Sequence, residues 1–175
     1  EHIESIQINA LESVSAEGRY AYYDGAGAMR DMVQSHLLQL VAYLTMDEPS
    51  DLKSGSLRKT KAELLKNIRP YRVSGANTNI VHGQYQGYLK EKGVKKNSHT
   101  ETYVACKFEL NTPKWRGVPI YIRTGKNLNQ KETSAIVQFK HASPVFVKNG
   151  GDTPKNRLMI QIALHPSITM ELNLD

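Results

Sequence analysis

The chain has 175 residues, of which 39% are hydrophobic, so a single domain with an ordinary core is expected. No apolar run approaches the ~18 residues of a membrane-spanning helix, and the chain starts with neither a basic nor an apolar leader. No membrane partner is therefore expected. The net charge of +6 favours anionic partners, such as a phosphorylated metabolite, a nucleotide or a nucleic acid, although solvated surface lysines explain it equally well.

The first part of the chain predicts one strand and two helices. Residues 3–14 alternate between apolar and polar and predict a strand. After a polar loop, apolar residues at helical spacing predict a helix over 26–46, with Asp24 as its N-cap and Pro49 beyond its end. A Lys-rich helix is predicted over 51–68. No aromatic residue is interleaved with its charges, which favours a solvated helix face over a nucleic-acid surface.

The second part predicts mostly strands. Residues 73–100 contain several glycines and lysines and predict a long surface loop. Five later segments alternate as strands do: 102–110, 118–123, 133–140, 158–164 and 168–174. One early strand, two helices and a late run of strands predict an α+β fold. In such a fold the helices pack on one face of a largely antiparallel sheet.

The predicted helix over 26–46 carries the most informative polar side chains, Asp31 and His36. Five residues separate them, which is roughly 140° around an α-helix, yet both can border one cleft if the helix runs along its floor. An imidazole takes up a proton near neutral pH, as a general base must. A single histidine on an apolar helix is, however, more often a structural residue than a catalytic one.

Cys106 is the only cysteine, so the sequence predicts neither an internal disulfide nor a cysteine-rich metal site. It lies in one of the alternating segments, which is typical of a structural thiol rather than a nucleophile. A single free thiol favours a reducing compartment, and the cytoplasm is the expected location.

Three segments together resemble glucose-6-phosphate dehydrogenase. They occur in the family's order and at similar spacing along the whole chain: Glu17-Gly18-Arg19 with Tyr22-Tyr23-Asp24 and residues 30–39, then Gly83-Gln84-Tyr85, then residues 115–129, which read WRGVPIYIRTGKNLN. The resemblance implies that residues 1–175 form part of the family's C-terminal β+α substrate domain. The family's N-terminal Rossmann domain is expected to be absent, because no Gly-x-Gly-x-x-Gly fingerprint occurs.

The resemblance also implies an activity and the residues that carry it. The family transfers a hydride from C1 of glucose 6-phosphate to NADP⁺ and forms the 6-phospho-lactone. His36 corresponds to the general base that removes the proton of the C1 hydroxyl. Glu12 and Asp31 correspond to carboxylates that accept hydrogen bonds from sugar hydroxyls. Lys126 and Lys131 correspond to positions that put positive charge near the phosphate ester of the substrate.

Two positions depart from the family pattern. His165 stands where the family often has Gln, and it is expected to keep a substrate contact because imidazole both donates and accepts hydrogen bonds. Arg123 matches one basic residue of a second, structural NADP⁺ site found in some relatives. Glu132 and Ala163 replace others, so no structural NADP⁺ is expected.

Two other functions compete with the enzyme. A basic module could bind nucleic acid through the Lys-rich helix and the lysines of residues 90–96, but no recognition-helix, RNA-binding or zinc-finger signature is present, so nucleic acid is not expected. A non-catalytic sheet domain could serve oligomerisation instead. Relatives dimerise through this sheet, so the complete enzyme is expected to be a homodimer or homotetramer. Without the cofactor domain, the chain alone is expected to be inactive.

Overall fold

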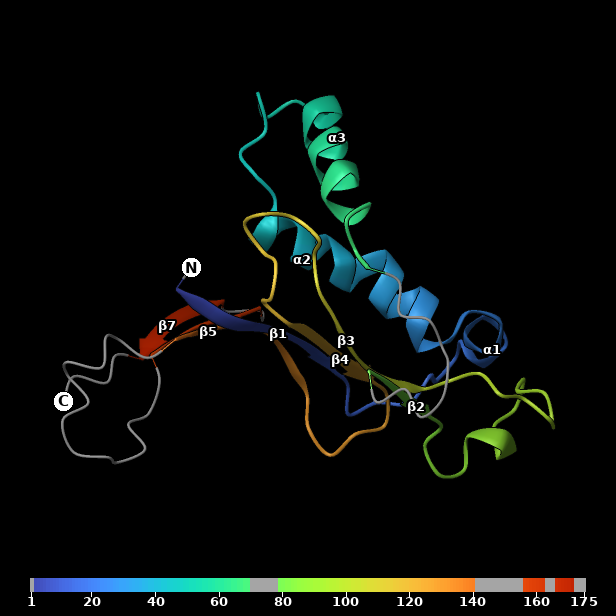
Figure 1. Ribbon diagram of the computed structural model, residues 1–175. Coiled ribbons are helices and arrows are strands. Elements are labelled where there is room, and N and C mark those ends of the chain that lie inside the picture. Colours follow the sequence, from blue (N-terminus) through green and yellow to red (C-terminus); the bar gives the residue numbers. More distant parts are fainter. Residues whose placement is uncertain (1, 70–78, 141–155, 163–165, 172–175) are drawn as a thin grey trace, which may run out of the picture.

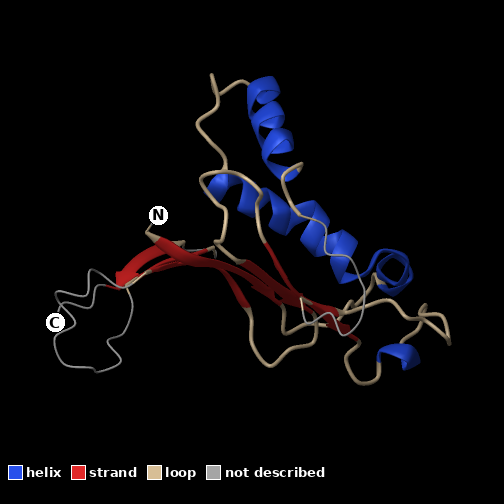
Figure 2. Cartoon of the chain, in the orientation of Figure 1, coloured by secondary structure: helices blue, strands red, loops and turns tan. Residues whose placement is uncertain are grey.

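The computed structural model describes residues 2–69, 79–140, 156–162 and 166–171. Figures 1 and 2 show a twisted sheet with the longer helices on one side of it, which confirms the predicted α+β fold. In chain order the elements are β1 (Ile3–Leu11), α1 (Tyr20–Ala28), the π-helix η1 (Met29–Leu37), α2 (Leu38–Thr45), α3 (Ser54–Leu65), β2 (Ile80–Gly83), the 3₁₀ turn η2 (Tyr88–Lys90), β3 (Tyr103–Phe108), β4 (Ile120–Gly125), β5 (Glu132–Phe139), β6 (Arg157–Gln161) and β7 (Ser167–Glu171).

The described strands form one sheet in the order β2-β3-β4-β1-β5-β6-β7. β1 runs parallel to β4, with Ile8 opposite Ile122, and antiparallel to β5, with Ile8 opposite Ala135. Every other neighbouring pair is antiparallel, so the sheet is largely antiparallel, as predicted. The sequence patterns missed β2. This strand lies at the edge of the sheet, and its two middle residues are both exposed, so it shows no alternation.

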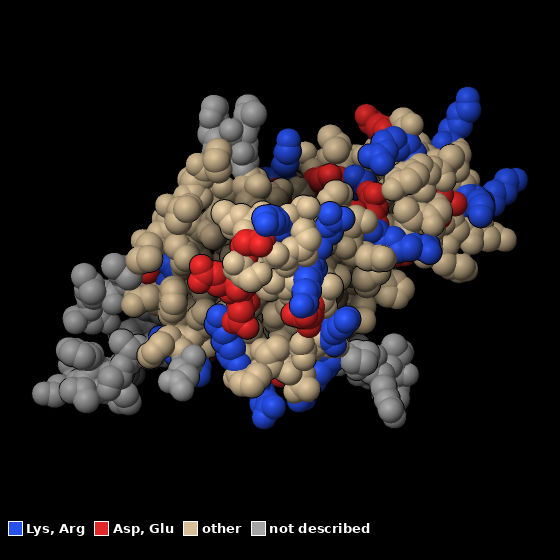
Figure 3. Space-filling model, turned by 90° about the horizontal axis from the view of Figure 1, so that it is seen from above, with Lys and Arg blue, Asp and Glu red and all other residues tan. Residues whose placement is uncertain are grey.

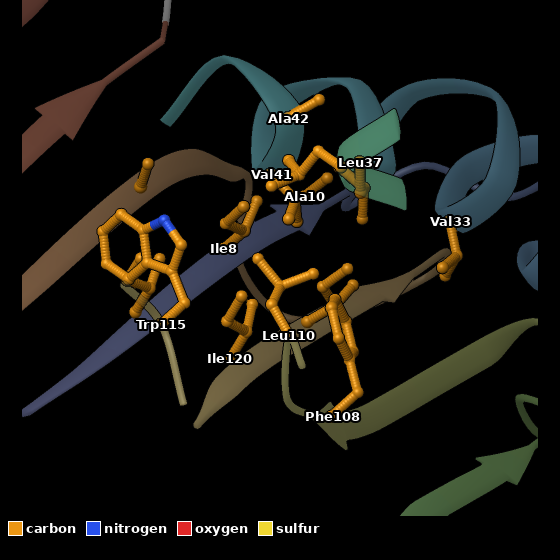
Figure 4. Close-up of a cluster of buried hydrophobic side chains, with 14 of the residues drawn as sticks. Ile8, Ala10, Val33, Leu37, Val41, Ala42, Phe108, Leu110, Trp115 and Ile120 are labelled. Atoms are coloured by element: carbon orange, nitrogen blue, oxygen red, sulfur yellow. The ribbon is translucent and has the colours of Figure 1, made fainter. Parts of the chain in front are cut away.

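The core lies between the sheet and the helices (Figure 4). Ile8 and Ala10 of β1 face the helix residues Val33, Leu37 and Val41, and all five side chains are buried. Burial of an aliphatic side chain of this size stabilises a fold by roughly 1.5–3 kcal/mol. The spacing of these helix residues, four positions each, is the pattern that predicted the buried face.

The predicted helix over 26–46 is confirmed within a few residues, but it is not α-helical throughout, and a further helix precedes it. The chain is helical from Tyr20, breaks at Gly27, where φ is +72° and ψ is 169°, and then continues as η1 and α2 to Thr45. A left-handed φ ends a right-handed helix, and glycine adopts it without steric cost. The second helix is confirmed within the predicted range, because α3 spans Ser54–Leu65.

Asp24 is not an N-cap. It is buried inside α1, where its carboxylate accepts hydrogen bonds from the Tyr88 hydroxyl at 3.1 Å, the Lys95 backbone N–H at 3.2 Å and the Ser98 hydroxyl. Burial opposes the charged form, but the hydrogen bonds, that of Ser98 first, outweigh it and hold the pKa of Asp24 below its ordinary value. As an N-cap, Asp24 would make one hydrogen bond to its own helix. In its buried position it accepts three from a distant segment.

The surface loop predicted over 73–100 contains regular structure in its described residues, 79–100. Besides β2 and η2, they carry Tyr85 and Tyr88, whose rings meet edge to face with centroids 5.4 Å apart. Tyr88 also meets Tyr23 edge to face at 6.5 Å, so this segment packs on α1. Burial raises the pKa of Tyr85 to about 12. Among the helices of the described residues, none has the length and hydrophobicity needed to pass through a bilayer.

Candidate active site

The carboxyl ends of β1 and β4 bring two predicted site residues together. Because these neighbouring strands are parallel, Glu12 and Lys126 leave the sheet at the same edge. The Glu12 N–H donates to the Gly125 carbonyl at 2.9 Å, which joins the two strand ends. A side chain at Gly125 would place its Cβ 2.7 Å from a ring carbon of Tyr103, so the close packing at this edge requires glycine.

Glu12 and Lys126 form an ion pair. The Lys126 side chain is 14% exposed and the Glu12 side chain 34% exposed, so the pair is reachable from solvent mainly through its carboxylate. The Lys126 ammonium also lies 5.3 Å from the centroid of the Tyr23 ring, a cation–π contact. The ammonium is thus fixed between a carboxylate and an aromatic face rather than extended into solvent.

Tyr23 lies beside the Lys126 ammonium. Its side chain is buried, and within the described part of the chain its hydroxyl has no hydrogen-bond partner. Burial and then the negative charges of Asp31 and Glu101 raise the pKa of Tyr23, with Glu12 adding to the effect. Both carboxylates predicted to bind sugar hydroxyls therefore lie within electrostatic reach of one buried phenol.

Asp31 and His36 lie on the π-helix η1. In a π-helix the backbone hydrogen bonds join residues five apart, so such residues lie on the same side of the helix. The wide register is seen at the end of η1, where the Leu38 N–H donates to the carbonyl of Val33, five residues earlier. Asp31 and His36 are therefore much closer around the axis than the α-helical winding predicted. Short π-helical segments occur frequently at functional sites.

The two side chains differ in exposure. Asp31 is half-buried and accepts a hydrogen bond from the Tyr22 hydroxyl at 3.2 Å. His36 is exposed, as are Gln34 and Ser35 beside it, while Val33 and Leu37 are buried. The imidazole is therefore accessible to a reactant from the solvent side of the helix.

The glycine-containing turn at Gly27 precedes the N-terminus of η1, a position where helices often bind phosphate. Here the chain's own Glu101 occupies it. The Met29 N–H donates to Glu101 Oε1 at 2.9 Å, and the Ala28 N–H donates to the Glu101 carbonyl at 2.9 Å. A dinucleotide phosphate does not fit this turn, because a carboxylate already fills it.

The remaining predicted residues lie apart from this group. Lys131 is exposed directly before β5, and the structure does not bring it into contact with Glu12 or Asp31. Glu132 accepts a hydrogen bond from the Asn9 amide at 3.0 Å. Arg123 lines a cavity of about 300 Å³ together with Gln7, Val81, Lys107 and Tyr121. His165 and Ala163 lie outside the described residues.

Figure 3 shows acidic and basic side chains interspersed over the helical face of the molecule, rather than one continuous basic surface. Within the described ranges, His, Cys, Asp and Glu side chains form no group of three or more that could hold a metal ion. Cys106 is half-buried in the sheet, and burial raises the pKa of its thiol, as expected for a structural cysteine.

The structure therefore assembles part of the predicted site. It pairs Glu12 with Lys126, places the Lys126 ammonium against the Tyr23 ring, and sets Asp31 and His36 on η1, which packs on β1 and β4. Two carboxylates and an ammonium can bind a polyol, and an exposed imidazole can take its proton. The roles of Tyr22 and Glu101 were not predicted, because hydrogen bonds between separate elements of the fold define them.

Comparisons with known proteins agree on one family. The family model described as "Glucose-6-phosphate dehydrogenase, C-terminal domain" matches residues 1–175. A glucose-6-phosphate 1-dehydrogenase of Gluconobacter oxydans is 40% identical over 185 residues, covering 99% of this chain and 37% of the relative. That of Aggregatibacter actinomycetemcomitans is 41% identical over 183 residues, covering 98% of this chain and 36% of the relative. The chain thus spans little more than a third of the curated relatives it matches.

Solved structures agree. The crystal structure of glucose-6-phosphate 1-dehydrogenase from Mycobacterium avium superposes with a TM-score of 0.87 at 35% identity, covering 98% of this chain and 38% of that one. A glucose-6-phosphate dehydrogenase in complex with its substrate glucose-6-phosphate superposes with a TM-score of 0.80 at 34% identity, covering 95% of this chain and 35% of that one.

Proposed function

Since this chain belongs to the glucose-6-phosphate dehydrogenase family, as part of its C-terminal domain, we propose that it forms the sugar-binding side of such an enzyme. The complete protein would oxidise glucose 6-phosphate at C1 to the 6-phospho-lactone, with NADP⁺ as the hydride acceptor. The observation that carries this proposal is the ion pair of Glu12 and Lys126 against the Tyr23 ring at the sheet edge, with Asp31 and His36 on the helix η1, which packs on β1 and β4.

NADP⁺, whose nicotinamide accepts the hydride, would be held by residues outside this chain. The glycine-containing turn before η1 is filled by the Glu101 carboxylate, so it offers no phosphate cradle. An N-terminal Rossmann domain, as the family resemblance implies, would supply that site. We also propose that the complete protein is cytoplasmic and assembles as a homodimer or homotetramer through the sheet, in line with the resemblance.

The chain's own residues would bind and deprotonate the sugar. Glu12 and Asp31 would accept hydrogen bonds from sugar hydroxyls, and the fixed Lys126 ammonium would donate one from the same side. His36, exposed on η1, would remove the C1 hydroxyl proton as the hydride leaves. Lys131 and His165 remain proposed substrate contacts on the strength of the resemblance alone.

A substrate panel on the complete protein that contains this chain tests the proposal. Glucose 6-phosphate with NADP⁺ should produce NADPH, followed by its absorbance, with a kcat/KM well above that of glucose, of other hexose phosphates and of non-sugar alcohols. A second series with NAD⁺ would establish the cofactor preference. Turnover of an unrelated alcohol in preference to glucose 6-phosphate would reject the assignment.

A further inference from the structure

We propose that Glu101 is a positioning residue for the reaction. By binding the N-terminus of η1 from the segment just before β3, it holds Asp31 and His36 in place relative to Lys126. The inference concerns the same site and rests on the proposed function for its kinetic consequences. Its structural part can be tested independently.

The contacts of Glu101 with the helix use both its main chain and its side chain. The Ala28 N–H donates to the Glu101 carbonyl and the Met29 N–H donates to Glu101 Oε1, each at 2.9 Å. The first N–H groups of a helix have no partner within the helix, and a carboxylate there also interacts favourably with the helix dipole. Since Asp31 is only two residues beyond Met29, the position of this cap sets the position of Asp31.

Gly27 makes room for this carboxylate. A Cβ at Gly27 would lie 2.5 Å from Glu101 Oε1 and 2.8 Å from both Oε2 and the carboxylate carbon. The φ of +72° at Gly27 also turns the chain so that α1 ends and η1 begins against Glu101. The break between the two helices and the contact with Glu101 are therefore parts of one arrangement.

Glu101 itself is firmly anchored. Thr102, the next residue, is fully buried, and its N–H donates to the Gly83 carbonyl at 2.8 Å. The Thr102 carbonyl accepts the Lys126 N–H at 3.0 Å. One dipeptide thus contacts both the helix that carries Asp31 and His36 and the strand end that carries Lys126.

The neighbouring hydrogen bonds reinforce this anchor. The Thr100 hydroxyl donates to the Asp24 carbonyl at 2.6 Å, and the Gln84 amide donates to the Thr100 carbonyl at 3.0 Å. A support fixed on several sides can hold a helix to within a fraction of an ångström. Misplacement of a catalytic group by about 1 Å costs on the order of 100-fold in rate.

Kinetics of the complete enzyme test the functional part. Glu101→Ala should lower kcat about 10- to 100-fold and raise KM for glucose 6-phosphate several-fold, because His36 and Asp31 both move. Glu101→Gln keeps an acceptor oxygen at Met29 and should recover most of the kcat. Glu91→Ala, which removes a carboxylate from the same loop, is the matched control and should leave both constants unchanged. A purely structural role would reduce the amount of active enzyme, measured by active-site titration, without changing KM.

Amide hydrogen exchange tests the structural part without reference to activity. In Glu101→Ala, exchange at Ala28 and Met29 should accelerate at least 10-fold, whereas amides at the centre of β4 should keep their protection. Gly27→Ala, which displaces the carboxylate, should cause the same local acceleration. The double variant should show no further acceleration from losing Glu101, since the carboxylate has already left.

These two experiments separate the possible failures. If the complete protein does not oxidise glucose 6-phosphate, the proposed function fails, while the exchange data still decide whether Glu101 fixes the helix. If Glu101→Ala folds and exchanges at Ala28 and Met29 as the unmodified protein does, the inference is overturned. It is also overturned if exchange accelerates but kcat and KM stay unchanged. If Glu101→Ala does not fold, Gly27→Ala, which also displaces the carboxylate, provides the same comparison with Glu101→Gln.

Discussion

Lys126 and Glu12, which are 114 positions apart in the sequence, form an ion pair at the carboxyl ends of two neighbouring parallel strands. The Lys126 ammonium of this pair lies over the face of the buried Tyr23 ring. This relationship changes the expected role of Lys126. From the resemblance we expected positive charge near the phosphate, but an ammonium that is already paired with Glu12 lies where the sugar hydroxyls are expected to bind.

Lys126→Ala in the complete enzyme should therefore weaken binding of glucose 6-phosphate and of free glucose by similar factors. Loss of a charge-assisted hydrogen bond costs about 1.5–3 kcal/mol, or roughly 10- to 100-fold in KM. The comparison of KM for the two sugars is the measurement, with the exposed Lys131→Ala as the matched variant. A loss confined to glucose 6-phosphate would show that Lys126 contacts the phosphate after all.

His36→Asn should lower kcat of the complete enzyme by about 10²–10⁴, with little change in the dissociation constant of glucose 6-phosphate. The exposed imidazole is proposed to take the C1 proton, and an amide cannot do so. His82→Asn makes the same substitution at an exposed residue of β2 and should leave turnover unchanged. Near-normal turnover in the His36 variant would remove the general base from the proposal.

Tyr22→Phe deletes the hydroxyl that donates to Asp31 and leaves the ring in place. Asp31 then loses a partner that orients its carboxylate, so KM should rise about 2- to 10-fold while stability changes by less than about 0.5 kcal/mol at this exposed position. Steady-state kinetics and thermal unfolding provide the two readouts. Tyr43→Phe, an exposed tyrosine next to α3, serves as the control. Equal KM values for Tyr22→Phe and the unmodified enzyme would show that Asp31 needs no such orientation.

Asp24→Asn should destabilise the chain at neutral pH by about 1.5–3 kcal/mol, because a buried carboxylate loses charge-assisted hydrogen bonds. The pKa of Asp24 is lowered in the folded state, so its contribution is present above the ordinary value of about 3.9 and disappears as the pH falls through the folded pKa. The difference between the variant and the unmodified chain should therefore shrink below about pH 4.

Urea unfolding of residues 1–175 at several pH values measures this difference. Tyr88→Phe removes only one of the three donors and should cost less than Asp24→Asn at neutral pH. A difference that stays constant down to the most acidic condition would mean that the Asp24 charge contributes nothing to stability.

Residues 1–175 alone should produce no NADPH from glucose 6-phosphate and NADP⁺. Hydride transfer requires the nicotinamide in contact with C1, and the turn before η1 that could have bound a phosphate holds Glu101 instead. The absorbance assay on the purified chain checks this, with the complete protein as the positive control. Sustained turnover above background would show that the chain contains a cofactor site of its own.

Much of the fold followed from local patterns. Alternation along residues 3–14 and the later segments predicted strands within a few residues of β1, β3, β4 and β5, because a half-buried strand needs an apolar residue at every second position. Spacing of Val33, Leu37 and Val41 predicted the face that packs on the sheet. The same reading missed β2, since a short edge strand with exposed residues leaves no such pattern.

For the candidate site, too, one part followed from the sequence and another part only from the tertiary structure. The sequence by itself determined the family, and it predicted Glu12, Asp31, His36 and Lys126 as site residues, because residue type and motif order can be read directly along the chain. Only the tertiary structure decided that Lys126 pairs with Glu12, that Asp24 is buried rather than a cap, and that Glu101 caps the helix. Each of these depends on segments more than 60 positions apart. Burial and hydrogen bonds across the fold, rather than local propensity, fix them, and no sequence period reports such contacts.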